Sequence, residues 1–332
     1  MMDKFKELKS IFPTIKKNVS LNDYCTFRIG GIADYFLEVD SSCELEKVIL
    51  FCNENNINFY IIGAGSNLLI SDKGFRGLII IYRRKFGDRK ISEDDFKPIG
   101  ENMFKIKLDA SFLLADAINQ FLNFGFSGIE WAAGIPGTLG GAINGNAGAF
   151  GSSISDNINE VDVLKIEKGK ADKIVMKKND CNFVYRSSIF KVSSDYIILS
   201  GIFILIKKDK KLIRGEIDNI LKKRVGKYPS GFSAGSIFKN YEGEIDKKLF
   251  KKYPELQIYN EKGIVPAGYL IEKCNLKGTK IGDAQISPNH ANFIINLGKA
   301  KSDSVLKLIA LIKKTVKEKF GISIQEEIKY LG

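Results

Sequence analysis

Two glycine-rich segments have the residue types and spacing best suited to binding a ligand. Segment 63–67 (GAGSN) directly follows the apolar run 59–62, and segment 128–151 holds eight glycines in 24 residues with Glu130 as its only charged side chain. Glycine lacks a Cβ and adopts positive φ, so its backbone turns sharply and presents N–H groups to a ligand. Clustered amide donors suit an anion, usually a pyrophosphate. The alternative, two irregular turns, fits poorly with the apolar residues between the glycines.

The residues around these glycines exclude two common nucleotide-binding motifs. A Rossmann fingerprint needs G-x-G-x-x-G between a strand and a helix. The glycines at 63 and 65 are instead followed by a β-like run, and the P-loop pattern G-x-x-x-x-G-K-[ST] does not occur. A dinucleotide bound by these segments therefore needs another architecture.

The composition is that of a globular chain with a substantial core. Its 332 residues are 44% apolar and 27% charged, which predicts two domains or three. The N-terminus has no apolar signal-peptide core. The longest apolar run, 196–206, is about half a membrane span. We therefore expect a cytoplasmic protein that binds no membrane.

Metal and nucleic-acid ligands are not expected. The five cysteines are far apart without a CxxC pair, and His290 is the one histidine, so a structural zinc site or a disulfide framework is not predicted. The net charge of +12 is typical of many nucleic-acid-binding proteins. However, the lysines are scattered and no helix-turn-helix, RNP signature or zinc finger is present. Solvated lysines and anionic small-molecule ligands explain the charge equally well.

Hydrophobic periodicity predicts a mixture of helices and strands without strict βαβ alternation, hence an α+β fold. Helices are predicted at 41–54, 112–124 (ending at Gly125), 212–224, from Pro266, and at 303–320 (ending at Gly321). Strands are predicted at 58–62, 68–71 and 78–82, within a β-rich region at 161–206, and near the C-terminus. The last of these is expected to place Ile322, Ile324, Ile328 and Tyr330 on one face.

Six segments of the chain resemble the bacterial UDP-N-acetylenolpyruvoylglucosamine reductases and occur in the family's order. They are 26–31 (TFRIGG), 63–69 (GAGSNLL), 134–149 (GIPGTLGGAINGNAGA), 185–188 (YRSS), 233–240 (SAGSIFKN) and 326–328 (EEI). Each segment alone is a weak signal, but six in register over nearly the whole chain are highly specific.

The resemblance implies the domain organisation. It predicts an FAD-binding domain of the vanillyl-alcohol-oxidase-like (PCMH) type, made of two subdomains, and a C-terminal α+β domain that binds substrate. We expect the first FAD subdomain at 1–77, joined by a C-terminal strand at 321–332. The second FAD subdomain is expected at 78–210 and the substrate-binding domain at 211–320.

The resemblance also implies a reaction. NADPH reduces FAD, and hydride from flavin N5 then reduces the enolpyruvyl ether of UDP-N-acetylglucosamine to UDP-N-acetylmuramate. This product is a peptidoglycan precursor, so the activity serves cell-wall biogenesis, cell shape and cell division. The short interval between Arg186 and Ser236 resembles the subclass that lacks an extra tyrosine-bearing loop. A monomer is expected.

Three residues match the family's catalytic positions. Arg186 corresponds to the arginine that faces the substrate carboxylate, where its planar fork suits bidentate contact. Ser236 corresponds to the proton donor, although without the resemblance it reads as a turn serine. Glu327 corresponds to a glutamate that works with the arginine, and we expect its pKa to be perturbed. Glu326 is its rival, since residue chemistry alone does not choose between the two.

Further residues match the family's binding segments. For FAD these are Arg28, Gly63, Ala64, Gly65, Ser66, Asn67, Leu68, Gly134, Ile135, Pro136, Gly137, Thr138, Gly140, Gly141, Asn144, Asn146, Ala147 and Gly148. For substrate they are Tyr185, Lys239, Asn240 and Gln285, with Arg224 and Lys227 as candidates for the UDP diphosphate. His290 is assigned no role.

The chain departs from the family pattern at two positions, and two other functions stay open. Cys25 stands where an Asn is usual and Tyr241 where a Pro is usual, which affects local loop geometry. A flavoprotein of the same fold with covalently bound FAD would need a His, Cys or Tyr at a flavin methyl, but the one histidine lies in the predicted substrate domain. A non-catalytic basic nucleotide- or RNA-binding module would bind polynucleotides in a salt-sensitive manner.

Overall fold

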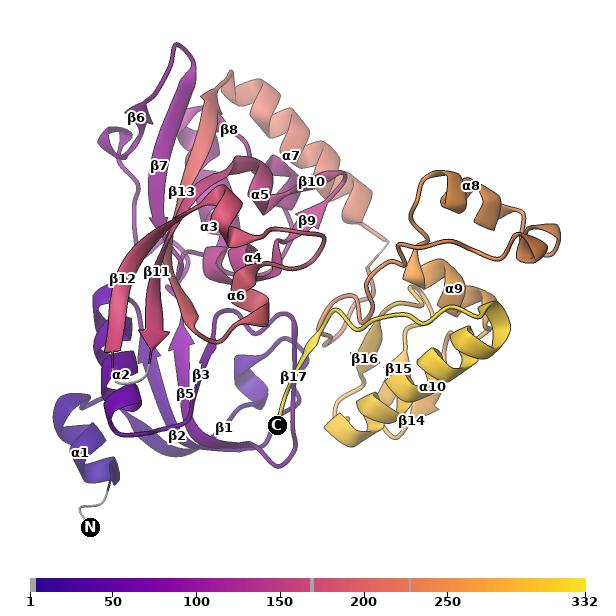
Figure 1. The fold of residues 1–332 in the computed structure, drawn as a ribbon, viewed down its shortest axis with the longest axis horizontal. Coiled ribbons are helices and arrows are strands. Elements are labelled where there is room, and N and C mark those ends of the chain that lie inside the picture. Colours follow the sequence, from indigo (N-terminus) through magenta and orange to yellow (C-terminus); the bar gives the residue numbers. More distant parts are fainter. Residues whose placement is uncertain (1–3, 168–169, 227) are drawn as a thin grey trace. The chain divides into compact units, whose positions relative to one another are not determined.

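The computed structural model describes residues 4–167, 170–226 and 228–332 (Figure 1). They form two compact units. The first comprises the residues up to Val19 together with Ala33–Ala64 and Arg76–Val225. The second comprises Ser20–Ile32, Gly65–Phe75 and the residues from Gly226 onward. The chain therefore crosses between the units near both ends of segments 20–32 and 65–75, and the first glycine-rich segment is divided between them.

The larger sheet of the first unit has six strands. Its order is β12 (Lys170–Lys177), β11 (Ile158–Glu167), β13 (Tyr196–Lys207), β7 (Met103–Asp109) and β6 (Lys97–Pro98), with β8 (Phe126–Ser127) paired to β13. All of these pairs are antiparallel, and β11, β13 and β7 run side by side in Figure 1. Phe203 and Leu205 of β13 are fully buried, which confirms the strand predicted from the apolar run 196–206.

A second sheet has the order β1 (Lys16–Ser20), β2 (Ile32–Val39), β5 (Phe75–Tyr82) and β3 (Phe59–Ile62), with β3 and β5 parallel. The helix α2 (Ser42–Glu54) lies between β2 and β3 in the sequence. It begins as predicted, because the Ser41 hydroxyl accepts a hydrogen bond from the Glu44 amide at 3.3 Å. Its buried face consists of Leu45, Val48, Ile49 and Cys52, as the periodicity indicated.

The remaining elements of the first unit are short, apart from two helices. They are α1 (Lys4–Ile11), η2 (Glu93–Asp95), α3 (Leu114–Phe124), η3 (Glu130–Ala132), α4 (Leu139–Gly145), β9 (Gly148–Ala149), β10 (Ser152–Ser153), α5 (Ile154–Asn157), η4 (Lys178–Cys181), α6 (Ile189–Val192) and α7 (Lys210–Arg224). The predicted end of α3 is confirmed, since Gly125 has a φ of 72° in the left-handed region.

The second unit is built from small sheets and three helices. The antiparallel sheet has the order β14 (Lys280–Ile281), β15 (Ala284–Ile286) and β16 (Ile294–Asn296), and β4 (Leu68–Ile70) pairs in parallel with β17 (Lys329–Leu331). Its helical segments are η1 (Asn22–Tyr24), η5 (Lys247–Lys251), α8 (Glu255–Glu261), α9 (Ala267–Lys273) and α10 (Ser302–Phe320). The predicted helices that start near Pro266 and end at Gly321 are both confirmed.

The C-terminal strand differs from its prediction. Ile322, Ile324 and Ile328 are buried as expected, but Tyr330 is 42% exposed and only Lys329–Leu331 forms a regular strand. The buried positions shift from even to odd numbers after Ile328, because Leu331 takes the inward position once the chain pairs with β4. Among the described residues, no helix is long and apolar enough to cross a bilayer.

Candidate active site

The second glycine-rich segment is held by a short antiparallel ladder in the first unit. The Leu114 amide donates to the Gly137 carbonyl at 3.0 Å, the Leu139 amide to Phe112 at 2.8 Å, and the Gly140 amide to Ala110 at 2.8 Å. A Cβ on Gly140 would lie 2.8 Å from the Cβ of Ala110, so only glycine allows this approach. The ladder fixes the backbone from which α4 begins.

Several donors in this segment are left for a ligand. Within the part of the chain that the structure describes, the amides of Gly137 and Thr138 donate no hydrogen bond, and the buried indole N–H of Trp131 has no acceptor. The Thr138 hydroxyl accepts from the Gly141 amide at 3.2 Å. A Cβ on Gly63, at the start of the first segment, would lie 2.5 Å from that hydroxyl. The two glycine segments therefore approach each other at Thr138, as residues that cradle a phosphate must.

Arg186 lies in a tight hairpin whose backbone is strained. The amides and carbonyls of Val184 and Ser187 exchange two hydrogen bonds of 3.1 Å, which leaves Tyr185 and Arg186 as the central residues. Arg186 has a φ of 54°, a conformation that costs a residue with a side chain about 1–3 kcal/mol. Its guanidinium donates to the Gly148 carbonyl at 2.6 Å and lies 5.1 Å from the centroid of the Tyr185 ring.

Two asparagines of the glycine segment bond this hairpin and the helix α6 that follows it. The Asn146 side chain donates to the Val184 carbonyl at 2.9 Å, and the Asn144 side chain donates to the Phe190 carbonyl at 2.8 Å. In return, the Ser188 hydroxyl donates to the Asn144 carbonyl at 2.7 Å. The structure therefore brings together the predicted cofactor segment and the predicted catalytic arginine within one unit.

Arg224 packs against the same segment at the end of α7. Its guanidinium donates to the Trp131 carbonyl at 3.4 Å and lies 5.1 Å from the Phe150 ring centroid. A Cβ on Gly134 would lie 3.0 Å from the Arg224 side chain. Lys227, the other predicted diphosphate contact, lies outside the described residues.

The second unit holds Ser236 and Glu327 on neighbouring backbone segments. Ser236 is half-buried and pairs with Phe293 in an isolated bridge, while the Glu327 amide donates to the carbonyl of Ile237 at 2.8 Å. The Ser236 hydroxyl makes no hydrogen bond to any residue that the structure describes. Glu326, by contrast, forms an ion pair with Lys313 at 2.9 Å. The choice between Glu326 and Glu327 as the functional carboxylate stays a prediction.

Two buried asparagines of the second unit position these segments, and sequence analysis assigned them no role. The Asn292 side chain bonds both the amide and the carbonyl of Phe238, at 2.9 and 2.8 Å. The Asn296 side chain donates to the carbonyls of Phe27 and Arg28, at 3.0 and 3.3 Å. The signal for them was available, since polar residues beside the apolar run 293–295 are rarely buried without a partner.

Other predicted residues of the second unit have structural partners. Arg28 forms an ion pair with Asp23 and lies over the Phe232 ring. The Asn67 side chain donates to the Glu327 carbonyl at 3.2 Å. The Asn240 side chain accepts from the Ala267 amide at 3.2 Å, which caps the start of α9.

The predicted substrate contacts Lys239 and Gln285 are also placed by local hydrogen bonds. The Lys239 amide donates to the Gln325 carbonyl at 2.9 Å, so Lys239 continues the segment that carries Ser236. The Gln285 side chain donates to the Gly278 carbonyl at 3.0 Å.

His290 is a packed structural residue. Its Nδ1 accepts from the Asn292 amide at 3.2 Å, and its ring lies 4.8 Å from the Phe293 centroid. Burial lowers the pKa of His290 below its ordinary value, with a further lowering from Lys277. The neutral imidazole is the form that accepts the Asn292 hydrogen bond.

Comparison with known proteins decides the family. Residues 227–331 match the C-terminal domain of UDP-N-acetylenolpyruvoylglucosamine reductase, and residues 33–174 match an FAD binding domain. The UDP-N-acetylenolpyruvoylglucosamine reductase of Clostridium novyi is 36% identical over 330 residues, covering 98% of this chain and 96% of its own length. This chain belongs to the UDP-N-acetylenolpyruvoylglucosamine reductase family.

Two more members of this reductase family support the assignment. The UDP-N-acetylenolpyruvoylglucosamine reductase of Carboxydothermus hydrogenoformans is 37% identical over 336 residues and covers 100% of both chains. The crystal structure of the enzyme from Thermus caldophilus matches with a TM-score of 0.70 and 27% identity, covering 96% of this chain and 100% of that one. The predicted α+β fold with an FAD-binding domain and a C-terminal reductase domain is confirmed, as is FAD as the cofactor.

Proposed function

We propose that this chain catalyses the NADPH-dependent reduction of UDP-N-acetylenolpyruvoylglucosamine to UDP-N-acetylmuramate. One hydride and one proton add across the enolpyruvyl double bond, and NADPH is oxidised to NADP⁺. Family membership supports the substrate class. The structural observation that most supports the chemistry is the adjacency of Ser236 and Glu327, whose segments are joined by the hydrogen bond from Glu327 to Ile237.

The proposed FAD site fits the residues present. FAD, when bound, accepts hydride from NADPH and delivers it from N5 to the substrate. The amides of Gly137 and Thr138 would bind its phosphates, because they point to no other acceptor among the described residues. The absence of side chains at Gly141 and Gly145 leaves room beside them. We assign the other predicted cofactor contacts of segment 134–148, with Gly63 and Ala64, to this site, and those at Arg28 and in segment 65–68 stay predictions.

Arg186 is proposed to stabilise the negative charge that develops on the substrate. Hydride addition at the terminal vinyl carbon places charge on the adjacent carbon and its carboxylate. A guanidinium that is already oriented stabilises such charge without reorganisation at the moment of reaction. The strained hairpin and the Gly148 contact give Arg186 this preorganised position.

Ser236 is proposed to donate the proton to the carbanionic carbon. Its hydroxyl is not engaged by any described residue, so it is available as a donor. A serine is a weak acid in water, but the enolic intermediate is a strong base, and positioned proton transfer accelerates such a step about 10²–10⁴-fold. Glu327 is proposed to act with Arg186 at the same carboxylate. The substrate roles of Tyr185, Arg224, Lys239, Asn240 and Gln285, the cytoplasmic location and the monomeric state remain predictions.

An anaerobic two-step titration tests this proposal. We expect NADPH to bleach the yellow protein and UDP-N-acetylenolpyruvoylglucosamine to restore the colour. In Ser236→Ala, the first step should stay within about threefold of wild type while the second slows by about 10² or more. Colourless protein that takes up no added FAD would refute the proposed function, whereas full turnover in Ser236→Ala would refute the role of Ser236 alone.

A further inference from the structure

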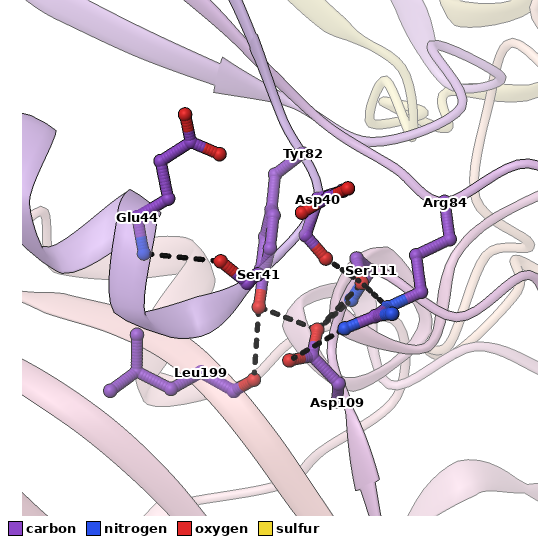
Figure 2. Close-up of polar contacts among 8 residues, drawn as sticks. All are labelled: Asp40, Ser41, Glu44, Tyr82, Arg84, Asp109, Ser111 and Leu199. Carbon is purple, nitrogen blue, oxygen red and sulfur yellow. Dashed lines mark hydrogen bonds and ion pairs between the residues drawn. The ribbon is translucent and has the colours of Figure 1, made fainter. Parts of the chain in front are cut away.

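A buried polar cluster joins the ends of two strands in the first unit (Figure 2). Tyr82 is the last residue of β5, Asp109 is the last residue of β7, and Ser111 follows Asp109 in the next turn. All three are less than one tenth exposed. The Tyr82 hydroxyl donates to Asp109 Oδ1 at 2.5 Å, and the amide and hydroxyl of Ser111 donate to the same oxygen at 2.9 and 2.6 Å.

An arginine balances the charge of this cluster. Arg84 Nε donates to the Ser111 hydroxyl at 3.1 Å, the Arg84 amide donates to the Ser111 carbonyl at 3.1 Å, and Arg84 Nη2 lies 3.9 Å from Asp109 Oδ2. Burial and the neighbouring Asp109 raise the pKa of Tyr82 well above its ordinary range, so its hydroxyl remains a donor at neutral pH. A buried carboxylate is tolerated when it is paired and hydrogen-bonded, and Asp109 has three hydrogen bonds to Oδ1 and the Arg84 ion pair at Oδ2.

Ser111, to which Asp109 is hydrogen-bonded, lies at the centre of the ladder described above. Ser111 lies between Ala110 and Phe112, whose carbonyls accept the amides of Gly140 and Leu139. A shift of the Ser111 backbone would therefore move both acceptors and, with them, the start of α4. The turn 110–112 therefore connects the polar cluster to the glycine segment.

We propose that Asp109 is a positioning residue for the flavin phosphates, acting through Ser111 and the ladder on the amides of Gly137 and Thr138. The inference depends on the proposed FAD site. Asp109 holds the turn in one conformation before FAD binds. Ordering of the loop therefore does not reduce the free energy of FAD binding. Loss of the carboxylate is expected to weaken FAD binding more than it slows the chemistry.

The test measures the Kd of FAD for the apoprotein, together with its urea unfolding midpoint, in Asp109→Asn and in a matched control. The control is Asp162→Asn, in the same sheet, where Asp162 accepts from the Ser200 hydroxyl at 2.7 Å and pairs with Lys107 but makes no hydrogen bond to the turn 110–114. We expect Asp109→Asn to raise the Kd about tenfold or more, equivalent to about 1.4 kcal/mol. Asp162→Asn should stay within about twofold, although both changes lower the unfolding midpoint.

A second readout separates positioning from general damage. With FAD saturating, the rate of reduction by NADPH in Asp109→Asn should stay within about threefold of wild type, because Asp109 acts at the phosphate end. The inference would be overturned if the Kd of Asp109→Asn is less than five times that of Asp162→Asn. It would also be overturned if Asp109→Asn lowers the rate of reduction while its Kd is unchanged. If Asp109→Asn does not fold, Ser111→Ala is judged by the same ratio.

Gly141→Asp separates failure of this inference from failure of the proposed FAD site. Gly141 is exposed in the first turn of α4, and the nearest atom to an added Cβ is the Thr138 hydroxyl at 3.4 Å. A carboxylate there favours the helix start but repels a phosphate. An unchanged Kd in Gly141→Asp would refute the FAD site, and the inference with it. A raised Kd in Gly141→Asp together with an unchanged Kd in Asp109→Asn would refute the inference but not the FAD site.

Discussion

At the scale of single residues, the structure distinguishes side chains that the sequence presents as equivalent. Glu326 and Glu327 are adjacent carboxylates, and both are half-buried. Glu326 pairs with Lys313 at 2.9 Å, and Glu327 donates its amide to the segment that carries Ser236. The Lys313 ion pair directs the Glu326 side chain toward α10, and the Glu327 backbone bonds the Ser236 segment.

The two glutamates therefore form a matched pair for mutagenesis. Glu327→Gln is expected to slow reoxidation of the reduced enzyme by the enolpyruvyl substrate about 100-fold or more, since a carboxyl group stabilises the developing enolate when it is protonated or paired with a cation, and the amide replaces neither role. Glu326→Gln loses an ion pair and should change this rate less than about threefold. Stopped-flow absorbance at the flavin band measures both rates. Equal effects of the two changes would contradict the assignment.

His290 predicts a pH dependence of stability. Its pKa is lowered in the folded chain, so the unfolded chain binds the proton more tightly. The stability that depends on neutral His290 is present above the unfolded pKa of about 6.5 and is lost as the pH falls from there through the folded pKa. We expect the urea midpoint of the apoprotein to fall between pH 7 and 5, and to fall less in His290→Gln. Parallel curves for the two proteins would contradict this reading.

At the scale of elements, hydrogen bonds of Asn146 hold the Arg186 hairpin against the glycine segment. Asn146 ends α4 with a φ of 42° and uses both ends of its amide, donating to Val184 and accepting from the Ser155 amide at 3.2 Å. A left-handed conformation suits both asparagine and glycine. The backbone can therefore be kept while the two hydrogen bonds are removed.

Asn146→Gly is expected to release the Arg186 hairpin without unfolding α4. The substrate half-reaction should slow about 10–100-fold, because a misplaced Arg186 guanidinium stabilises the transition state less and so raises its free energy. Asn56→Gly is the control, since Asn56 has a φ of 50° but lies after α2, far along the chain. Comparison of the two half-reactions by stopped flow tests the idea. A slowed Asn56→Gly, or an unaffected Asn146→Gly, would disprove the coupling.

At the scale of the whole molecule, the two units divide the predicted site residues between them. Arg186 and the second glycine segment belong to the first unit, and Ser236 and Glu327 to the second. The segments 20–32 and 65–75 belong to the second unit although the chain before and after each of them lies in the first, and β4 of segment 65–75 pairs with the C-terminal strand β17. Folding of the second unit therefore depends on residues from both ends of the chain.

The manner of flavin attachment is a whole-molecule prediction. The one histidine, His290, is packed against Phe293 and accepts a hydrogen bond from Asn292, which fits a structural role. We expect noncovalent FAD, so acid precipitation should leave all of the flavin in the supernatant. Yellow colour retained in the washed precipitate would instead support the alternative of a covalent flavoprotein.

Much of the fold was predictable because its signals are local. Helix α2 was located by its capping serine and the spacing of Leu45 to Cys52, and the ends of α3 and α10 by Gly125 and Gly321. The shift of the inward-facing positions that leaves Tyr330 exposed was not predictable from the sequence. It is decided by the pairing of β17 with a strand about 260 residues earlier. The phosphate and catalytic assignments came from motif resemblance and remain predictions.

The sequence by itself determined the family, the glycine-rich backbone and the residue types available for chemistry, since these depend on composition and order along the chain. Only the tertiary structure decided which partners those residues have. Asp109 meets Tyr82, Asn146 meets Val184, and Asn292 meets Phe238 through contacts between segments that are distant in sequence. Such contacts depend on packing of the whole chain, because a buried polar group is stable only where folding supplies its partner.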